Sequence, residues 1–174
     1  MSHVIKLPAV WTPLNISENS DPQNVLNQME EILERWNGTP YGSGQRLCGV
    51  AADCIGFGTG AIDDIDGRPR AQDPSIPPDT ALHDPKRSAA AVLALVRAYE
   101  PAVQVTNSKL QPFDLIVVGP NEGGPGHAML VGPQRNTLWH CTKGVGVHKA
   151  GWCLGDGYNR LFAAYRMGDR ERWL

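Results

Sequence analysis

The apolar pattern of the chain changes near residue 101, and this change is the feature that most constrains the fold. Before it, the segment 22–36 has the apolar spacing of an amphipathic helix, with Asp21 as the expected N-cap and Pro22 as its first residue. The segment 86–100 is a second strong helix prediction. After it, short apolar runs are separated by Gly, Pro and Asn, as in VQVTN, FDLIVVG, HAMLVG, TLWHCT, GVGVHKA and RLFAAYRM. Helices followed by a meander of strands predict an α+β domain with an antiparallel sheet.

Composition and charge narrow the classes of function. The 174 residues carry a net charge of -2, which gives no electrostatic reason to expect nucleic acid or an anionic membrane as a partner. No apolar run is long enough to cross a bilayer, so we expect no transmembrane segment. The first 20 residues lack the apolar stretch of a signal peptide, and we therefore expect synthesis in the cytoplasm. In that reducing compartment the four cysteines are expected to be free thiols.

A further helix is expected from about Asp53 to Asp66, with Asp53 as a candidate N-cap. Its glycines weaken the helix by roughly 1 kcal/mol each relative to Ala, but they also let another backbone approach closely. Cys54 lies where this helix begins. A helix N-terminus favours a thiolate through its unpaired N–H groups and its dipole, so Cys54 is a candidate nucleophile.

Two histidines in the second half of the chain are candidate bases for that thiol. His127 and His140 each lie on a predicted strand, and the PQRN segment between the strands is typical of a hairpin turn. A tight hairpin would bring the two imidazoles side by side. This arrangement provides the base and the orienting group that a cysteine hydrolase requires. His148, on the next predicted strand, is expected to be a surface residue.

Other interpretations of these residues are possible. Cysteine is among the most buried residue types, so Cys54, taken alone, could be an unreactive residue of the hydrophobic core. A zinc site made of Cys54, His127, His140 and Cys141 is a sharper alternative. However, adjacent residues of a strand point to opposite faces, so His140 and Cys141 do not converge on one ion. We therefore expect no metal and no cofactor.

Two blocks of the sequence resemble the NlpC/P60 cysteine peptidases, papain-like enzymes that cleave peptidoglycan stem peptides. The stretch GTPYGSGQ…ADCIGF is similar to the tyrosine and DC[SA]G block of that family. The stretch FDLIVVG…GHAMLVG…NTLWHCTKGVGV is similar to its second block. The match covers roughly residues 36–147, and the form that it resembles most is the compact one of phage tails and phage-like particles.

The resemblance implies a role for each matching residue. Cys54 would be the nucleophile, His127 the base and His140 the orienting third residue. Tyr41 would help to bind the oxyanion, and Asp53 precedes the nucleophile as the aspartate of the family does. We therefore place Tyr41 and Asp53 on the oxyanion and substrate side of the site. As a helix cap, Asp53 also has a purely structural interpretation.

Two residues depart from the family pattern. Ile55 stands where a small residue usually follows the cysteine, and Phe113 stands where a glycine often precedes the DL strand. Neither change removes a catalytic atom, and both bear on the range of substrates.

These observations lead to one expected fold and one expected function. We expect a papain-like NlpC/P60 fold of class α+β, with N-terminal helices packed on a central antiparallel sheet. A single domain would span residues 1–174, and 1–35 would be an N-terminal extension. The expected function is hydrolysis of the peptidoglycan stem peptide, most naturally at the γ-D-glutamyl–diamino acid bond, by a phage-tail or phage-like-particle protein acting on the cell wall. The alternatives are a structural tail component that keeps the fold, and a cytoplasmic amidase or acyltransferase on the same scaffold.

Overall fold

The computed structural model of the chain describes residues 10–11, 21–67, 102–105, 109–119, 126–152 and 160–167. The predicted helix 86–100 and most of the loop 67–85 lie outside this part. The described elements, in chain order, are β1 (Val10–Trp11), α1 (Pro22–Trp36), β2 (Arg46–Leu47), β3 (Ala51–Ala52), α2 (Cys54–Asp66), β4 (Ala102–Gln104), β5 (Lys109–Leu110), β6 (Asp114–Gly119), β7 (His127–Val131), β8 (Thr137–Thr142), β9 (Gly146–Gly151) and β10 (Arg160–Met167).

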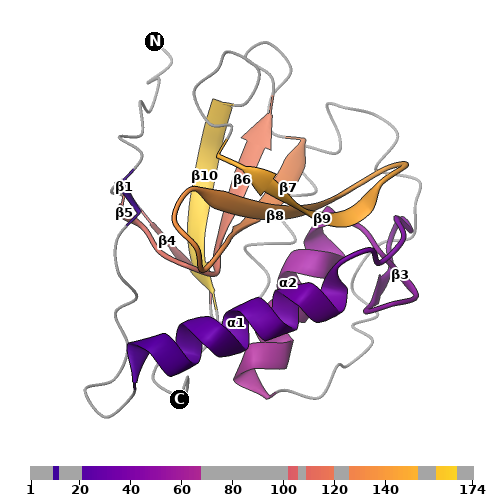
Figure 1. The fold of residues 1–174 in the computed structure, drawn as a ribbon. Coiled ribbons are helices and arrows are strands. Elements are labelled where there is room, and N and C mark those ends of the chain that lie inside the picture. The colour runs from indigo at the N-terminus through magenta and orange to yellow at the C-terminus, as the bar shows by residue number, and fades with distance from the viewer. Residues whose placement is uncertain are drawn as a thin grey trace, which may run out of the picture.

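A six-stranded sheet organises the molecule. Its strand order is β4-β10-β6-β7-β8-β9, and every neighbouring pair in it is antiparallel. Figure 1 shows α1 and α2 together on one side of this sheet. The predicted α+β arrangement of helices and an antiparallel sheet is therefore confirmed. In the described part of the chain, neither helix is long and apolar enough to cross a membrane.

The sheet separates two apolar clusters. We call the first the helix-side core, because it combines both helices with one face of the sheet. Its sheet members include Leu115, Val117, Ala128, Leu130, Trp139, Cys141 and Val147. We call the second the far-side core, which lies on the other face and includes Ile116, Val118, Met129, Val131 and Leu138. The alternation along β6, β7 and β8 thus assigns each side chain to one core or the other.

Helix α1 begins and ends where the sequence predicts. The Asp21 side chain accepts a hydrogen bond from the N–H of Gln23 at 3.0 Å, and Pro22 opens the first turn. The apolar face of the helix is fully part of the helix-side core: Val25, Met29, Ile32, Leu33 and Trp36 are buried. The part of the N-terminal extension from Pro22 onward is thus a helix that shares its core with the sheet.

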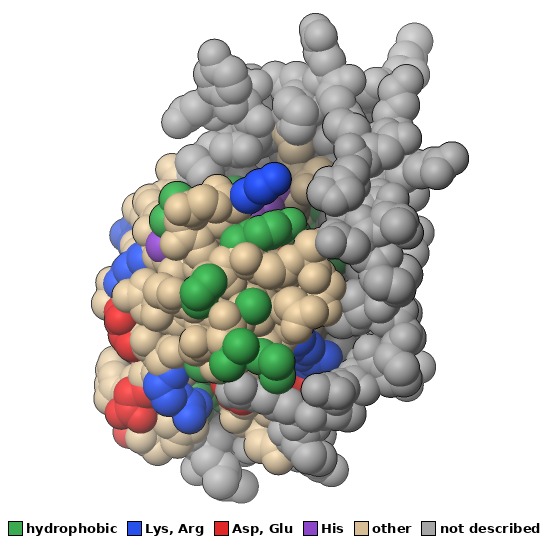
Figure 2. All heavy atoms as spheres, turned by 90° about the vertical axis from the view of Figure 1, so that its right-hand side faces the viewer, with side chains coloured by type: hydrophobic (Ala, Val, Ile, Leu, Met, Phe, Trp, Pro, Cys, Tyr) green, Lys and Arg blue, Asp and Glu red, His purple; other side chains and the backbone are tan. Residues whose placement is uncertain are grey.

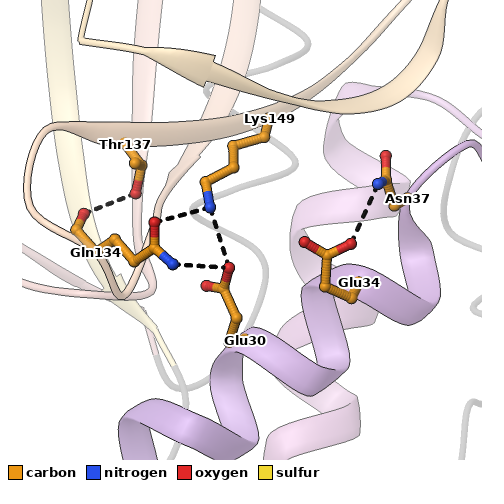
Figure 3. Close-up of polar contacts among 6 residues, drawn as sticks. All are labelled: Glu30, Glu34, Asn37, Gln134, Thr137 and Lys149. Carbon is orange, nitrogen blue, oxygen red and sulfur yellow. Dashed lines mark hydrogen bonds and ion pairs between the residues drawn. The ribbon is translucent and has the colours of Figure 1, made fainter.

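Polar contacts hold α1 to two hairpins of the sheet. Lys149 on β9 donates to Glu30 on α1 at 3.0 Å and to Gln134, in the turn between β7 and β8, at 2.9 Å. Gln134 also donates to Glu30, at 3.2 Å, which closes the triangle seen in Figure 3. The ammonium of Lys149 lies 5.8 Å from the ring centre of Trp139, so Lys149 faces the helices.

The glycines of α2 permit close packing at its start. A Cβ on Gly56 would overlap the carbonyl oxygen of Gln45, and a Cβ on Gly58 would lie 2.5 Å from Leu115. The loss of helix propensity at these positions therefore accompanies the close approach of the preceding loop and of β6. The helix ends at Gly67, which has the left-handed conformation (φ 63°) of a C-cap.

Candidate active site

Cys54 is the first residue of α2, and Asp53 caps the helix in front of it. Oδ1 of Asp53 accepts from the N–H groups of Ile55 at 3.1 Å and Gly56 at 2.7 Å. Oδ2 accepts from the N–H of Gly44 at 2.9 Å, which ties the preceding loop to the start of the helix. Both carboxylate oxygens of this buried side chain are therefore used to hold the backbone around Cys54.

The resting state of the Cys54 sulfur differs from the expectation based on the helix N-terminus. Burial, followed by the negative charge of Asp53, raises the pKa of the Cys54 thiol to about 12. The N–H groups of Ala128 and Ile55 interact with the thiol and act in the opposite direction, but more weakly than burial. The expectation of a favoured thiolate was wrong because burial and the neighbouring carboxylate of Asp53 outweigh the effect of the N–H groups near the sulfur. The resting cysteine is thus a thiol.

The hairpin of β7 and β8 brings two of the predicted residues together. Leu130 pairs with Trp139 and Val131 with Leu138, so His127 and His140 lie on the same face of the sheet. Nε2 of His127 lies 2.8 Å from Nδ1 of His140, within one hydrogen bond. The ring centres are 5.1 Å apart, with an angle of 63° between the planes.

A third histidine joins this pair. His148 is directly opposite His140 in the pairing of β8 with β9, and the two ring centres are 4.3 Å apart at 46°. The prediction of a surface position for His148 was wrong, because it is half-buried against His140. The sequence contains a signal for this contact: a hairpin turn centred on Gly144 puts residues 140 and 148 opposite each other. We call His127, His140 and His148 the histidine cluster.

Burial and the neighbouring histidines keep His127 and His140 neutral. Burial, followed by the neighbouring charges of His140 and His148, lowers the pKa of His127 to about 4. Burial and then His148 lower the pKa of His140 to about 4 as well. Both imidazoles are therefore uncharged at neutral pH, which is the state in which a histidine accepts a proton.

The start of β7 lies beside the start of α2. The N–H of Ala128, the residue after His127, interacts with the Cys54 thiol, and Cys54 packs against the helix-side core. The alternation of β7 puts the His127 side chain on the other face, with Met129 and Val131. Among the residues that the structure describes, no hydrogen bond joins Cys54 to His127. The structure thus places the two residues at neighbouring strand and helix ends, without a hydrogen bond between their side chains.

Tyr41 lies in the loop that leads to Cys54. Its backbone forms a bridge with Ala52, two residues before Cys54, and its side chain is 37% exposed. Three further large apolar side chains are exposed, namely Leu47 on β2, Val50 in the turn between β2 and β3, and Val145 in the turn between β8 and β9. Figure 2 views the side of the molecule that carries β3 and shows separate hydrophobic groups across this face, one of them beside a histidine. We call the four exposed side chains Tyr41, Leu47, Val50 and Val145 the apolar rim.

Cys141 and Cys48 have hydrogen-bond partners outside the histidine cluster. Cys141 is buried in the helix-side core, where its Sγ donates to the carbonyl of Ala52 at 3.0 Å. Cys48 donates to the carbonyl of Arg35 at 3.2 Å. Over the described ranges, no group of three or more His, Cys, Asp or Glu residues has an arrangement that could hold a metal ion. The separation of His140 from Cys141 agrees with the alternation argument against a zinc site, and Cys153 lies outside the described residues.

Phe113 explains one departure from the family pattern. It is fully buried and has a φ of 62°, the left-handed region that favours glycine. Its N–H donates to the carbonyl of Val131 at 2.8 Å, and Asp114 behind it accepts from the N–H of Gln111 at 2.8 Å. The backbone therefore keeps a glycine-like conformation here while the side chain fills the core.

No family model matches this chain, and no curated protein matches it. Among solved structures, the chain is similar to the NlpC/p60 domain of the peptidoglycan hydrolase SagA, with 18% identity and a TM-score of 0.46 over 80% of this chain and 96% of that one. It is also similar to a lipoprotein-like protein of the NLP/P60 family from Staphylococcus aureus subsp. aureus Mu50, with 18% identity and a TM-score of 0.51. That second match covers 91% of this chain and 45% of the other, so this chain spans less than half of its length.

The similarity to the Staphylococcus aureus protein shows the fold. The chain has the α+β fold of NlpC/P60 proteins, as the two sequence blocks predict.

Proposed function

We propose that this chain is a cysteine endopeptidase of the NlpC/P60 family that hydrolyses peptidoglycan stem peptides. The observation that carries the proposal is the hydrogen bond between Nε2 of His127 and Nδ1 of His140, on a strand whose start lies beside the helix end that carries Cys54. A bond at Nε2 leaves Nδ1 of His127 for the thiol, which is the geometry of a base held by an orienting residue. The fold and the two sequence blocks support the same assignment.

The proposed mechanism starts from a neutral pair. Nδ1 of His127 takes the proton of the Cys54 thiol as the sulfur attacks the scissile carbonyl carbon. The charge then passes to His127, and its Nε2–H donates to His140. Because the resting thiol has a raised pKa and no direct bond to His127, substrate binding must bring the two side chains together. Proton transfer and attack are therefore coupled, rather than preceded by a standing thiolate–imidazolium pair.

The later steps use the backbone and the same histidine. The cap bonds of Asp53 go to Ile55 and Gly56, so the Cys54 N–H is the first helical donor that the cap does not take. That N–H, with the Tyr41 hydroxyl, would stabilise the oxyanion. His127 returns its proton to the leaving amine, and the sulfur keeps the acyl group. A water molecule, deprotonated by His127, then releases the acid and restores the thiol.

The scissile bond and the phage association in this proposal come from the resemblance to the NlpC/P60 peptidases. The bond would be the one between γ-D-glutamate and the diamino acid of the stem peptide. The protein would belong to a phage tail or phage-like particle and would act on the cell wall. The exposed apolar rim of Tyr41, Leu47, Val50 and Val145 would contact the peptide near the nucleophile.

Mass spectrometry of digested peptidoglycan tests this function. The wild-type chain should release stem-peptide fragments, and Cys54→Ala should release none, because no other side chain replaces the sulfur as acyl carrier. Cys48→Ala is the matched control. The Cys48 thiol donates to the carbonyl of Arg35 and has no part in the proposed mechanism, so this variant should cleave as the wild type does. Equal products from Cys54→Ala and wild type would contradict the mechanism, and no products from the wild type would contradict the substrate.

A further inference from the structure

We propose that His148 is a positioning residue of this site: its ring fixes the plane of the His140 ring, and through it the imidazole of His127. This inference rests on the proposed hydrolase function. His140 lies between two other histidines, with a hydrogen bond to His127 on one side and the ring of His148 on the other. Neither the resemblance nor the sequence pattern gives His148 a role.

The proton positions show why His140 needs a second support. For His127 to accept the thiol proton at Nδ1, its own proton must lie on Nε2 and be donated to Nδ1 of His140. His140 then carries its proton on Nε2. Among the described residues, Nε2 of His140 is buried and has no hydrogen-bond partner. The ring of His140 is thus held by one hydrogen bond only, and packing must supply the remaining constraint.

The ring of His148 is placed to supply it. The ring centres of His140 and His148 are 4.3 Å apart at 46°, which is contact between the two aromatic groups. The residues are direct partners across β8 and β9, so the strand pairing itself sets this contact. A rotation of the His140 ring away from His127 would have to displace the His148 ring.

His148 is itself held in place. Its Nδ1 donates to the carbonyl of Gly146 at 3.0 Å, which requires a proton on Nδ1. Gly146 is fixed in turn, because its φ is 85° and a Cβ there would overlap the carbonyl of Thr39. The N–H of Val147 donates to the same Thr39 carbonyl at 2.8 Å. The support therefore extends from the loop after α1, through the β8–β9 turn, to the histidine cluster.

The protonation state of His148 also affects His127 and His140. A proton on His148 opposes a proton on His127 and on His140, and both of these rings have lowered pKa values in part for that reason. The adjacent Lys149 does not add to this effect on the same face, because its ammonium lies over Trp139 and bonds to Glu30. A neutral His148 is thus the form that supports proton uptake by His127.

Three variants test the proposal by steady-state kinetics on a soluble stem-peptide substrate. His148→Ala removes the ring and should lower kcat by about 10-fold or more, with KM changed by less than about threefold. His148→Phe keeps a flat ring and should recover most of that loss. Lys149→Ala is the matched control on the opposite face of β9; it loses the contacts to Glu30 and Gln134 and should keep the wild-type kcat. Equal kcat for His148→Ala and wild type would overturn the proposal.

NMR of the histidine ring nitrogens tests the positioning role of His148 without requiring enzymatic turnover. In a Cys54→Ala background, the spectrum should show His140 as the Nε2–H tautomer, and His148→Phe should keep it. His148→Ala should give a mixture of tautomers, because the ring is then free to turn. An unchanged His140 spectrum in His148→Ala would overturn the inference even if the chain proved inactive on peptidoglycan. Inactivity of the wild type with the expected spectra would contradict only the proposed function.

Discussion

The helix side of the site and its strand side are held by different kinds of interaction. On the helix side, Asp53 uses both carboxylate oxygens on backbone N–H groups of Gly44, Ile55 and Gly56. On the strand side, three imidazoles hold one another through a single hydrogen bond and two ring contacts. The proposed nucleophile, Cys54, is therefore placed by the backbone, and the proposed base, His127, by neighbouring side chains.

This difference predicts different consequences of substitution. A change on the helix side should alter the stability of the fold and the pKa of the thiol. A change in the histidine cluster should alter the orientation of the base, and so kcat, while the fold stays intact. Side chains that orient a ring can be replaced one at a time, whereas a buried cap serves several backbone groups at once.

The largest effect should come from the base itself. His127→Asn removes the proton carrier and should lower kcat/KM by about 100-fold to 10,000-fold. Steady-state kinetics measures this loss, and circular dichroism checks that the variant is folded. Activity within a few-fold of the wild type would show that another group takes the thiol proton.

The orienting residue should have a smaller effect that depends on hydrogen bonding. His140→Leu cannot accept the Nε2–H of His127 and should lose about 10-fold to 100-fold in kcat. His140→Asn keeps an acceptor and should retain clearly more activity. Equal and near-wild-type rates for the Asn and Leu variants would show that His140 does not orient His127, even though Nε2 of His127 lies 2.8 Å from Nδ1 of His140.

Asp53 tests the helix side. Asp53→Ala removes the cap and should lower the free energy of unfolding by at least about 1–2 kcal/mol in urea titrations. Asp53→Asn keeps a side-chain oxygen for the cap but removes the negative charge that raises the Cys54 pKa. Its Cys54 should therefore react faster with iodoacetamide at a fixed pH. Equal labelling rates in Asp53→Asn and wild type would mean that the carboxylate does not hold the thiol protonated.

The smallest effect should be the pH dependence of stability. The pKa values of His127 and His140 are lowered from 6.5 to about 4 in the folded chain. The unfolded chain therefore binds these protons first, and the stability they contribute is present above 6.5 and lost as the pH falls toward 4. The urea midpoint should fall over this window, and it should fall less in His140→Asn, which has one such group fewer. The same decrease in both proteins would assign the effect to other residues.

Local patterns were enough to predict much of the fold. The bounds of α1 follow from Asp21, Pro22 and the apolar spacing up to Trp36, all within one segment. The strands β6, β7 and β8 follow from short apolar runs between turn residues. The pairing of His127 with His140 was also predictable, because the hairpin that joins them is local.

The remaining features depend on contacts between distant segments. The sharing of a core between α1 and the sheet is not visible in the helix pattern alone. The second bond of Asp53, to Gly44, and the direction of the Cys54 pKa depend on how the loop folds back and on burial. The contact of His148 with His140 depends on the pairing of β9 with β8, and the pattern of β9 alone does not show it. At Phe113, core packing overrides the backbone preference that the residue type suggests.

The most direct test of the central claim is to trap the acyl intermediate. A soluble stem peptide is mixed with the protein, the reaction is stopped with acid within its first turnovers, and the protein is digested and analysed by mass spectrometry. The account predicts that the peptide containing Cys54 gains the mass of the acyl fragment on the amino side of the cleaved bond, and that the gain decreases as the substrate is consumed. Product formation with no adduct on Cys54, or with the adduct on another residue, would contradict the account.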